Sequence, residues 1–193
     1  GSLIADGTPT QRITFTKAGN DVWYGIDAMD RTTQVIFDHV LFEYSERGIM
    51  ISGPQSPSSI TFSEFRYNEV YAVIFRTDGT GVFSDNLVTD NGSVGVDAEN
   101  AQVLRNTIIN SVGTGLYVSG STAIVRHNVI SGNDHLGVGF NNAADFSYNT
   151  ITANRREGIQ GYSPAACVFH HNNIYGNGRY AFRTQSSYPG IGH

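Results

Sequence analysis

Two acidic residues, Asp97 and Glu99, are separated by one residue in the run Val96-Asp97-Ala98-Glu99. If this run is a strand, both carboxylates project from one face about 7 Å apart, because strand side chains alternate. Two carboxyl groups near that separation can serve as the acid and the base of inverting glycoside hydrolysis. Their oxygens can equally bind Ca²⁺. A third interpretation is an acidic patch on a solvated strand.

A second group of polar side chains lies one or two places before successive asparagines. The group comprises Arg105, Arg126, His127, Tyr148, His170 and His171. If those asparagines are structurally equivalent, the group forms one outward-facing strip. A histidine in such a strip can act as a base, and an arginine can neutralise a uronate carboxylate, as β-elimination from an acidic polysaccharide requires. A polar corner without a ligand is the alternative.

Both groups are positioned by an internal repeat of 20–24 residues. An Asn-type position recurs at His39, Ser63, Asn86, Asn106, Asn128, Asn149 and Asn172. A small residue follows nine places later, at Gly48, Ala72, Gly95, Gly115, Gly137, Gly158 and Ala181. A repeat of this length without helical periodicity is typical of a stacked β-solenoid.

Three columns of apolar residues run through the repeat. The first extends from Ile36 to Phe169, the second from Leu41 to Ile174 and the third from Ile26 to Phe182. All members are apolar although the chain is 39% apolar, and β-branched and aromatic residues predominate, as in strands. The pattern predicts about eight coils, each with three short strands around a shared core.

A second asparagine column lies five places after the first. It contains Asn68, Asn91, Asn133, Asn154 and Asn177, and Tyr44 and Ser111 take that place in two coils. Asparagine closes turns onto its own backbone and tolerates positive φ, and stacked amides can hydrogen-bond from coil to coil. We therefore interpret most of the asparagine as architecture.

The runs Val103-Leu104-Arg105-Asn106-Thr107-Ile108 and Val125-Arg126-His127-Asn128-Val129-Ile130 resemble right-handed parallel β-helix repeats. Such repeats occur in pectate-lyase-like proteins and in carbohydrate-binding and sugar-hydrolase domains. The stretch Trp23-Tyr24-Gly25-Ile26 resembles the opening coils of β-helix domains in large bacterial surface proteins. The resemblance implies an all-β, single-stranded, right-handed parallel β-helix. It also implies a polysaccharide or glycan partner, neighbouring domains in a longer chain, and an extracellular, periplasmic or cell-surface location.

In pectate-lyase-like enzymes the substrate lies on the outer face of one parallel sheet. The resemblance implies that this sheet is formed by the strands after the small residues. Candidate substrate-binding residues on its outer side are Arg76, Tyr117, Asn141 and Tyr162, beside Asp97 and Glu99 as candidate catalytic or calcium-binding residues. The strip adds Arg126, His127, His170 and His171 as further candidates. The catalytic lysine and acidic calcium cluster of pectate lyases and the Asp-Pro-His-Asp motif of alginate epimerases are missing.

Bulk properties narrow the function classes. The net charge of -5 without a basic run argues against nucleic acid as a partner. No stretch of 18 apolar residues is present, so we expect no membrane insertion. The single Cys167 provides no disulfide framework. We predict that residues 1–2 are left over from cloning, that 3–184 form the β-helix, and that the tail 185–193 covers the last coil.

Three functions fit the sequence: a carbohydrate-binding module, a polysaccharide lyase or glycoside hydrolase, and a rigid spacer or adhesin segment without a small-molecule site. Coil lengths vary by only a few residues, so no long turns are expected to wall a groove. A shallow surface favours binding or scaffolding over catalysis. Whether the chain is an enzyme stays open at this point, and calcium is the one cofactor that the residues suggest.

Overall fold

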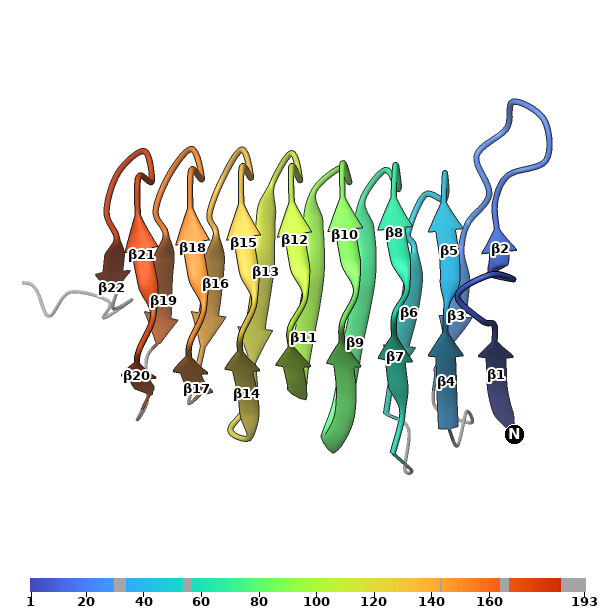
Figure 1. Cartoon of the computed structure of the whole chain (residues 1–193), viewed down its shortest axis with the longest axis horizontal. Coiled ribbons are helices and arrows are strands. Elements are labelled where there is room, and N and C mark those ends of the chain that lie inside the picture. Colours follow the sequence, from blue (N-terminus) through green and yellow to red (C-terminus); the bar gives the residue numbers. More distant parts are fainter. Residues whose placement is uncertain (30–33, 54–56, 143, 164–166, 185–193) are drawn as a thin grey trace, which may run out of the picture.

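The computed structural model describes residues 1–29, 34–53, 57–142, 144–163 and 167–184. These residues form short strands stacked coil upon coil into an elongated β-solenoid, with the chain advancing steadily from one end to the other (Figure 1). Strands of successive coils pair in parallel, and no helix occurs in the described residues. The predicted all-β parallel solenoid is confirmed.

Each complete coil has three faces. The first face holds β1 (Ser2–Asp6), β4 (Gln34–Asp38), β7 (Ser59–Thr61), the second half of β9 (Tyr71–Ser84) and of β11 (Val94–Leu104), β14 (Ala123–Arg126), β17 (Ala144–Ser147) and β20 (Val168–His170). The second face holds β2 (Ile13–Phe15), β5 (Val40–Glu43), β8 (Glu64–Arg66), β10 (Leu87–Thr89), β12 (Thr107–Ile109), β15 (Val129–Ser131), β18 (Thr150–Thr152) and β21 (Asn173–Tyr175).

The third face holds β3 (Ile26–Ala28), β6 (Ile49–Ser52), the first halves of β9 and β11, β13 (Thr114–Ser119), β16 (Val138–Asn141), β19 (Ile159–Ser163) and β22 (Phe182–Thr184). The long strands β9 and β11 continue from the third face to the first. For that reason these two faces form one 14-stranded sheet, whereas the second face is a separate 8-stranded sheet.

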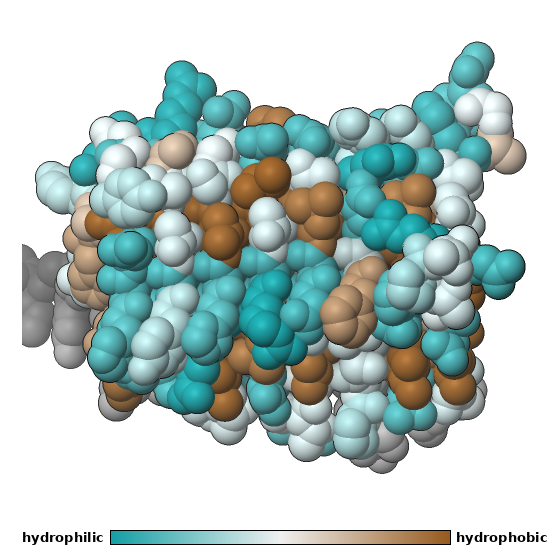
Figure 2. All heavy atoms as spheres, viewed as in Figure 1, coloured by the Kyte–Doolittle hydropathy of each residue, from teal (hydrophilic) through white to brown (hydrophobic). Residues whose placement is uncertain are grey.

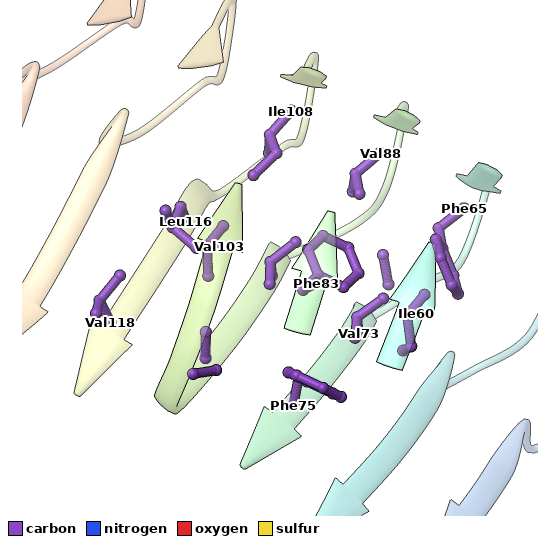
Figure 3. Close-up of a cluster of buried hydrophobic side chains, with 14 of the residues drawn as sticks. Ile60, Phe65, Val73, Phe75, Phe83, Val88, Val103, Ile108, Leu116 and Val118 are labelled. Carbon is purple, nitrogen blue, oxygen red and sulfur yellow. The ribbon is translucent and has the colours of Figure 1, made fainter. Parts of the chain in front are cut away.

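The apolar columns point into the solenoid and fill it. In one coil Phe83, Val88 and Val96 come from three different faces, and each is completely buried. Figure 3 shows how equivalent side chains of neighbouring coils stack along the axis, as Ile60, Phe83 and Val103 do. Because equivalent apolar side chains lie on one another, each coil buries apolar surface against the coil before it and the coil after it, and this burial stabilises the stack.

One coil departs from the predicted frame by one residue. Phe37 pairs with Ile60 and Phe42 with Phe65, so these phenylalanines are the buried members of the columns. Ile36 and Leu41, which the frame placed inward, are partly exposed instead. Because strand side chains alternate, a shift of one residue exchanges the two sides of a strand.

The physical reason is a shorter turn in that coil. Ser45, and not Tyr44, stacks on Asn68, and two residues lie between Ser45 and Gly48 where three lie between Asn68 and Ala72. The Gly48 amide closes this turn by donating to Ser45 Oγ at 2.6 Å. Upstream, Val40 takes the Asn-type position predicted for His39, and its amide donates to Ser63 Oγ.

Two buried asparagine ladders tie the coils together at the corners. In the first ladder the backbone amide and Nδ2 of Asn106 both donate to Asn128 Oδ1, at 2.9 and 3.0 Å. Asn106 Nδ2 also donates to the carbonyl of Phe83 in the preceding coil. The same pattern links Asn128 to Asn149. The side-chain amides thus hydrogen-bond the backbone N–H and C=O groups that have no strand partner at the corner.

Each ladder residue is preceded by a residue with positive φ. At the first corner these are His39, Phe62, Asp85, Arg105, His127, Tyr148 and His171, with φ from 48° to 60°. Such values are uncommon for residues other than glycine, and they turn the chain sharply between the first and second faces. The side chains at this corner therefore point outward while the asparagine that follows points inward.

No helix in the described part of the chain is long and apolar enough to cross a membrane. The tail 185–193, for which a covering role was predicted, lies outside the described residues.

The ladders predict that replacement of a buried asparagine is costly. Asn128→Ala removes the acceptor of the Asn106 amide and leaves the Val103 carbonyl without its side-chain donor. We expect the free energy of unfolding to fall by about 2–4 kcal/mol, measured by chemical denaturation. The control Asn173→Ala alters an exposed asparagine on the second face and should change stability by less than about 0.5 kcal/mol. Equal losses would refute the structural role of the ladder.

Candidate functional site

The outer side of the third face brings together the acidic residues and their predicted neighbours. Asp97 pairs with Ile74 on one side and Tyr117 on the other, and Glu99 pairs with Arg76. Val96 and Ala98 between them are completely buried. The structure therefore places Arg76, Asp97, Glu99 and Tyr117 on the outside of three adjacent coils.

Arg76 contacts both carboxylates. Its Nη2 donates to Asp97 Oδ2 at 2.7 Å, and its Nε lies 3.9 Å from Glu99 Oε2. The hydrogen bond to Asp97 raises the pKa of Arg76, although its partial burial opposes the shift. Hydrolysis by two carboxyl groups needs room between them for a water molecule and the scissile bond, and here the Arg76 guanidinium contacts both carboxylates. The arrangement thus suits ion pairing better than acid catalysis, and a catalytic role for this pair stays a prediction.

A calcium ion does not fit these residues as they are arranged. The space beside Asp97 and Glu99 is taken by the Arg76 guanidinium, which carries a positive charge. Among the described residues no group of three or more His, Cys, Asp or Glu side chains could hold a metal ion. Ca²⁺ favours six to eight oxygen ligands, so binding here would require Arg76 to move away.

Two tyrosines pack over a glycine to form an aromatic surface, which we call the platform. The rings of Tyr117 and Tyr162 lie 6.2 Å apart between centroids, tilted by 44°. A Cβ on Gly139 between them would lie 3.1 Å from Tyr117 Cδ2 and 3.4 Å from Tyr162 Cε2. Glycine at this position therefore lets both rings lie close to the sheet.

Tyr162 lies at a bulge in β19. Phe140 pairs with Gly161 and Asn141 with Ser163, so Tyr162 is an extra residue and does not lie beside Asn141. Both residues were named from the sequence as candidates on the outer side, and the bulge takes them out of register with each other. Asn141 is half-buried, and its Oδ1 has no hydrogen-bond partner among the described residues. Because that oxygen has almost no exposed surface of its own, it is not open to a ligand beside the platform as the side chain is arranged.

The predicted strip divides into two adjacent rows. Arg105, His127, Tyr148 and His171 occupy the positive-φ corner, whereas Arg126 and His170 lie on the ends of β14 and β20. The rings of His127, Tyr148 and His171 stack in parallel at 5.0 and 4.8 Å. In Figure 2 a mostly hydrophilic band runs along the middle of this side of the molecule. Stacked rings turn their edges, with their polar atoms, towards solvent.

A chain of polar contacts connects the two rows. Arg126 donates to Asp145 Oδ2, and His170 Nε2 lies 3.5 Å from Asp145 Oδ1. The Nδ1 atoms of His170 and His171 are 3.0 Å apart, so one of them must carry the proton and the other must accept it. If His171 donates, its Nε2 is left with a free lone pair at the solvent edge.

Several residues beside these sites were missed by the sequence analysis. They are Asp145 on the first face and His135, Arg156, Glu157, Arg179 and Arg183 at the edge of the third. Asp145 could have been noticed in the sequence because its equivalents in the neighbouring coils, Ile124 and Val168, are apolar. For Glu157 the signal was an acid directly after Arg155 and Arg156.

The family described as "Right handed beta helix region" matches residues 10–145 and 103–191. The chain belongs to the right-handed β-helix family. The predicted hand and family of the solenoid are thereby confirmed. No curated protein matches the chain in sequence.

Two solved structures share the fold. The A-module of the mannuronan C-5 epimerase AlgE6 from Azotobacter vinelandii has a TM-score of 0.69 and 16% identity, over 78% of this chain and 44% of that protein. A double mutant of the periplasmic alginate epimerase AlgG has a TM-score of 0.72 and 16% identity, over 99% of this chain and 48% of that protein. The chain thus spans less than half the length of either relative.

We expect the two tyrosines of the platform to lose their phenolic protons at a higher pH than an ordinary tyrosine does. Burial raises the pKa of Tyr117, with a contribution from Asp97, and burial also raises the pKa of Tyr162. Both phenols should stay protonated at a pH where an ordinary tyrosine is half ionised, about 10. In an alkaline titration followed by phenolate absorbance, Tyr117→Phe and Tyr162→Phe should each remove part of the late rise. The control Tyr175→Phe alters an exposed ring and should leave that part intact.

Proposed function

We propose that this chain is a polysaccharide-binding β-helix module that holds its ligand on the outer side of the third face. The observation that carries the proposal is the platform of Tyr117 and Tyr162 over Gly139, flanked by charged and amide groups. Binding sites for small ligands combine aromatic surface with a few fixed polar groups. The apolar faces of sugar rings fit aromatic rings, and their hydroxyl groups fit carboxylates and amides.

The charged groups beside the platform are held in place without a ligand. Arg76 fixes Asp97, whose side chain is 12% exposed, while Glu99 is 42% exposed. The exposed carboxylate of Glu99 is an acceptor for sugar hydroxyl groups. Fixed acceptors reduce the conformational entropy lost on binding. The Arg76 guanidinium contacts both carboxylates, where hydrolysis needs room for a water molecule and the scissile bond, which is why binding is preferred to hydrolysis.

The two structural relatives support a glycan ligand in general terms. Both are named as epimerases, of mannuronan and of alginate. The Asp-Pro-His-Asp motif is absent from this chain, so we do not extend that activity to it. We propose further that the module belongs to a longer protein located in the periplasm, outside the cell or at its surface.

The platform can be tested by affinity electrophoresis in gels that contain neutral or acidic polysaccharides. The chain should be retarded by at least one of them, and Tyr117→Ala and Tyr162→Ala should weaken binding at least about tenfold, which corresponds to about 1.4 kcal/mol. Tyr175→Ala on the second face is the matched control. Retardation unaffected by either platform variant would place the ligand elsewhere. No retardation across the panel would favour the rigid spacer or adhesin segment.

A second candidate function is a polysaccharide lyase at the first corner. The contacts from Arg126 through Asp145 and His170 to His171 favour it, because they leave His171 Nε2 as a base at the solvent edge. A lyase also needs a cation to neutralise the uronate. The candidates are Arg126, which is joined to His170 through Asp145, and Arg105, which lies three coils from His171 at the same corner. Arg105 is engaged by Asp85 through two hydrogen bonds of 2.7 Å.

Lyase activity is tested by the ultraviolet absorbance of unsaturated products and by new reducing ends, with acidic polysaccharides as substrates. If the corner is catalytic, His171→Ala and His170→Ala should lower the rate at least about a hundredfold, the usual contribution of a general base. His39→Ala, at the same corner several coils away, is the control. Absence of product with every uronate polymer would dismiss this candidate and leave binding at the platform unaffected.

A further inference from the structure

A completely buried carboxylate lies at the edge of the third face. The Glu157 side chain is 0% exposed, and its Oε1 accepts a hydrogen bond from Arg183 Nη1 at 3.2 Å. Arg156 Nε lies 3.6 Å from the other oxygen, Oε2. Burial alone would raise the pKa of Glu157, but hydrogen bonds from its own backbone amide and from Arg183, with the charges of Arg156 and Arg179, lower it. Glu157 is thus an ionised internal partner of Arg156 and Arg183, and the charge of Arg179 acts on it from nearby.

His135 adds no charge of its own to this group. Arg156 Nη1 donates to His135 Nε2, so the imidazole accepts at that nitrogen and carries its proton on Nδ1, 3.4 Å from Thr114 Oγ1. Burial lowers the pKa of His135, and the nearby charge of Arg156 lowers it further. The neutral imidazole holds the Arg156 side chain in place.

The arginines outnumber the acids. Arg156, Arg179 and Arg183 contribute three positive charges and Glu157 one negative charge, which leaves an excess of two. Asp134 and Arg155, on the adjoining turns, carry opposite charges and cancel. The chain as a whole has a net charge of -5. A local positive excess on an acidic protein attracts anions to that place.

The arginines are accessible despite their internal partner. The side chains of Arg156 and Arg183 are 35% and 40% exposed. A depression of about 700 Å³ is lined by Arg179, Tyr180, Phe182 and Arg183. The Arg183 guanidinium lies over the Tyr180 ring, 5.8 Å from its centroid. Their guanidinium groups are therefore ordered and open to solvent at once.

This arginine cluster continues the row of the platform. Arg183 pairs with Gln160, and Gln160 pairs with Gly139, the floor beneath Tyr117 and Tyr162. Two coil steps, about 10 Å, separate the backbone at Gly139 from that at Arg183. A glycan lying along the axis over the platform would thus meet the cluster within a few sugar units.

We propose that Arg156, Arg179 and Arg183 form an anion subsite at the edge of the third face, which binds an oxyanion of an acidic polysaccharide, either a uronate carboxylate or a sulfate ester. The proposal rests on the function proposed above and names the class of its ligand. Arginine suits the role because its planar fork donates two parallel hydrogen bonds to an oxyanion. Glu157 keeps the forks ordered before the ligand arrives.

The test measures the affinity of the full chain for three probes by isothermal titration calorimetry: alginate oligosaccharides, the same oligosaccharides with reduced carboxyl groups, and dextran sulfate. Arg156→Gln and Arg183→Gln are compared with the wild type. Arg12→Gln is the matched control, because it removes the same charge from an exposed ion pair with Glu64 at the other end of the solenoid. Circular dichroism and melting temperature verify that each variant is folded.

We expect the cluster variants to weaken alginate binding roughly tenfold each, the usual loss for a charge-assisted hydrogen bond. Arg12→Gln should change it less than twofold. The carboxyl-reduced probe should bind wild type and variants alike, and more weakly than alginate. A loss confined to dextran sulfate would assign the subsite to sulfate esters.

Equal binding of both acidic probes by wild type and cluster variants would overturn the anion subsite. If Tyr117→Ala still abolished binding in that case, the platform and the proposed function would stand. If the wild type bound none of the probes and no polysaccharide in the gel panel, both proposals would fail.

Discussion

The asparagine ladders are the interaction on which the rest of the molecule depends. Every coil must turn sharply between its first and second faces, and a sharp turn leaves amides and carbonyls without sheet partners. Each ladder amide accepts from one coil and donates to another, as Asn128 does between Asn106, Val103 and Asn149. The corners of successive coils are thereby held in one register. That register aligns the outer side chains into rows, and both candidate sites consist of such rows.

Alignment brings charges together as well as apolar groups, and several arginines pair with an acid on a neighbouring coil. Arg76 neutralises Asp97, Arg105 neutralises Asp85, and Arg126 neutralises Asp145. A row of unpaired like charges at the spacing of the coils would repel itself. The arginines around Glu157 are an exception, since three of them share one buried acid. Functional surface is therefore expected where pairing is incomplete or where aromatic rings replace charges.

The sequence was sufficient for the fold because a period of 20–24 residues with apolar columns leaves few alternatives. Local departures from the period were not predictable. A turn shortened by one residue exchanged Ile36 for Phe37 as the buried residue, and a one-residue bulge took Tyr162 out of register with Asn141. Contacts between coils, such as Glu157 with Arg183, join residues more than twenty positions apart. Pairing of that kind depends on side-chain conformations that no spacing specifies.

The first corner has a consequence for how such a protein can change. Its backbone is the same in every coil, with φ near 55°, yet its outward residues are as different as Phe62, Asp85, Arg105 and Tyr148. Because the inward asparagine maintains the turn, the residue before it is free to vary in chemistry. The corner therefore carries one outward-facing side chain on each coil, at intervals of about 5 Å, whose chemistry can vary without a change of the backbone. Substitutions at these positions can change the charge and polarity of the outer surface while the core of the solenoid stays the same.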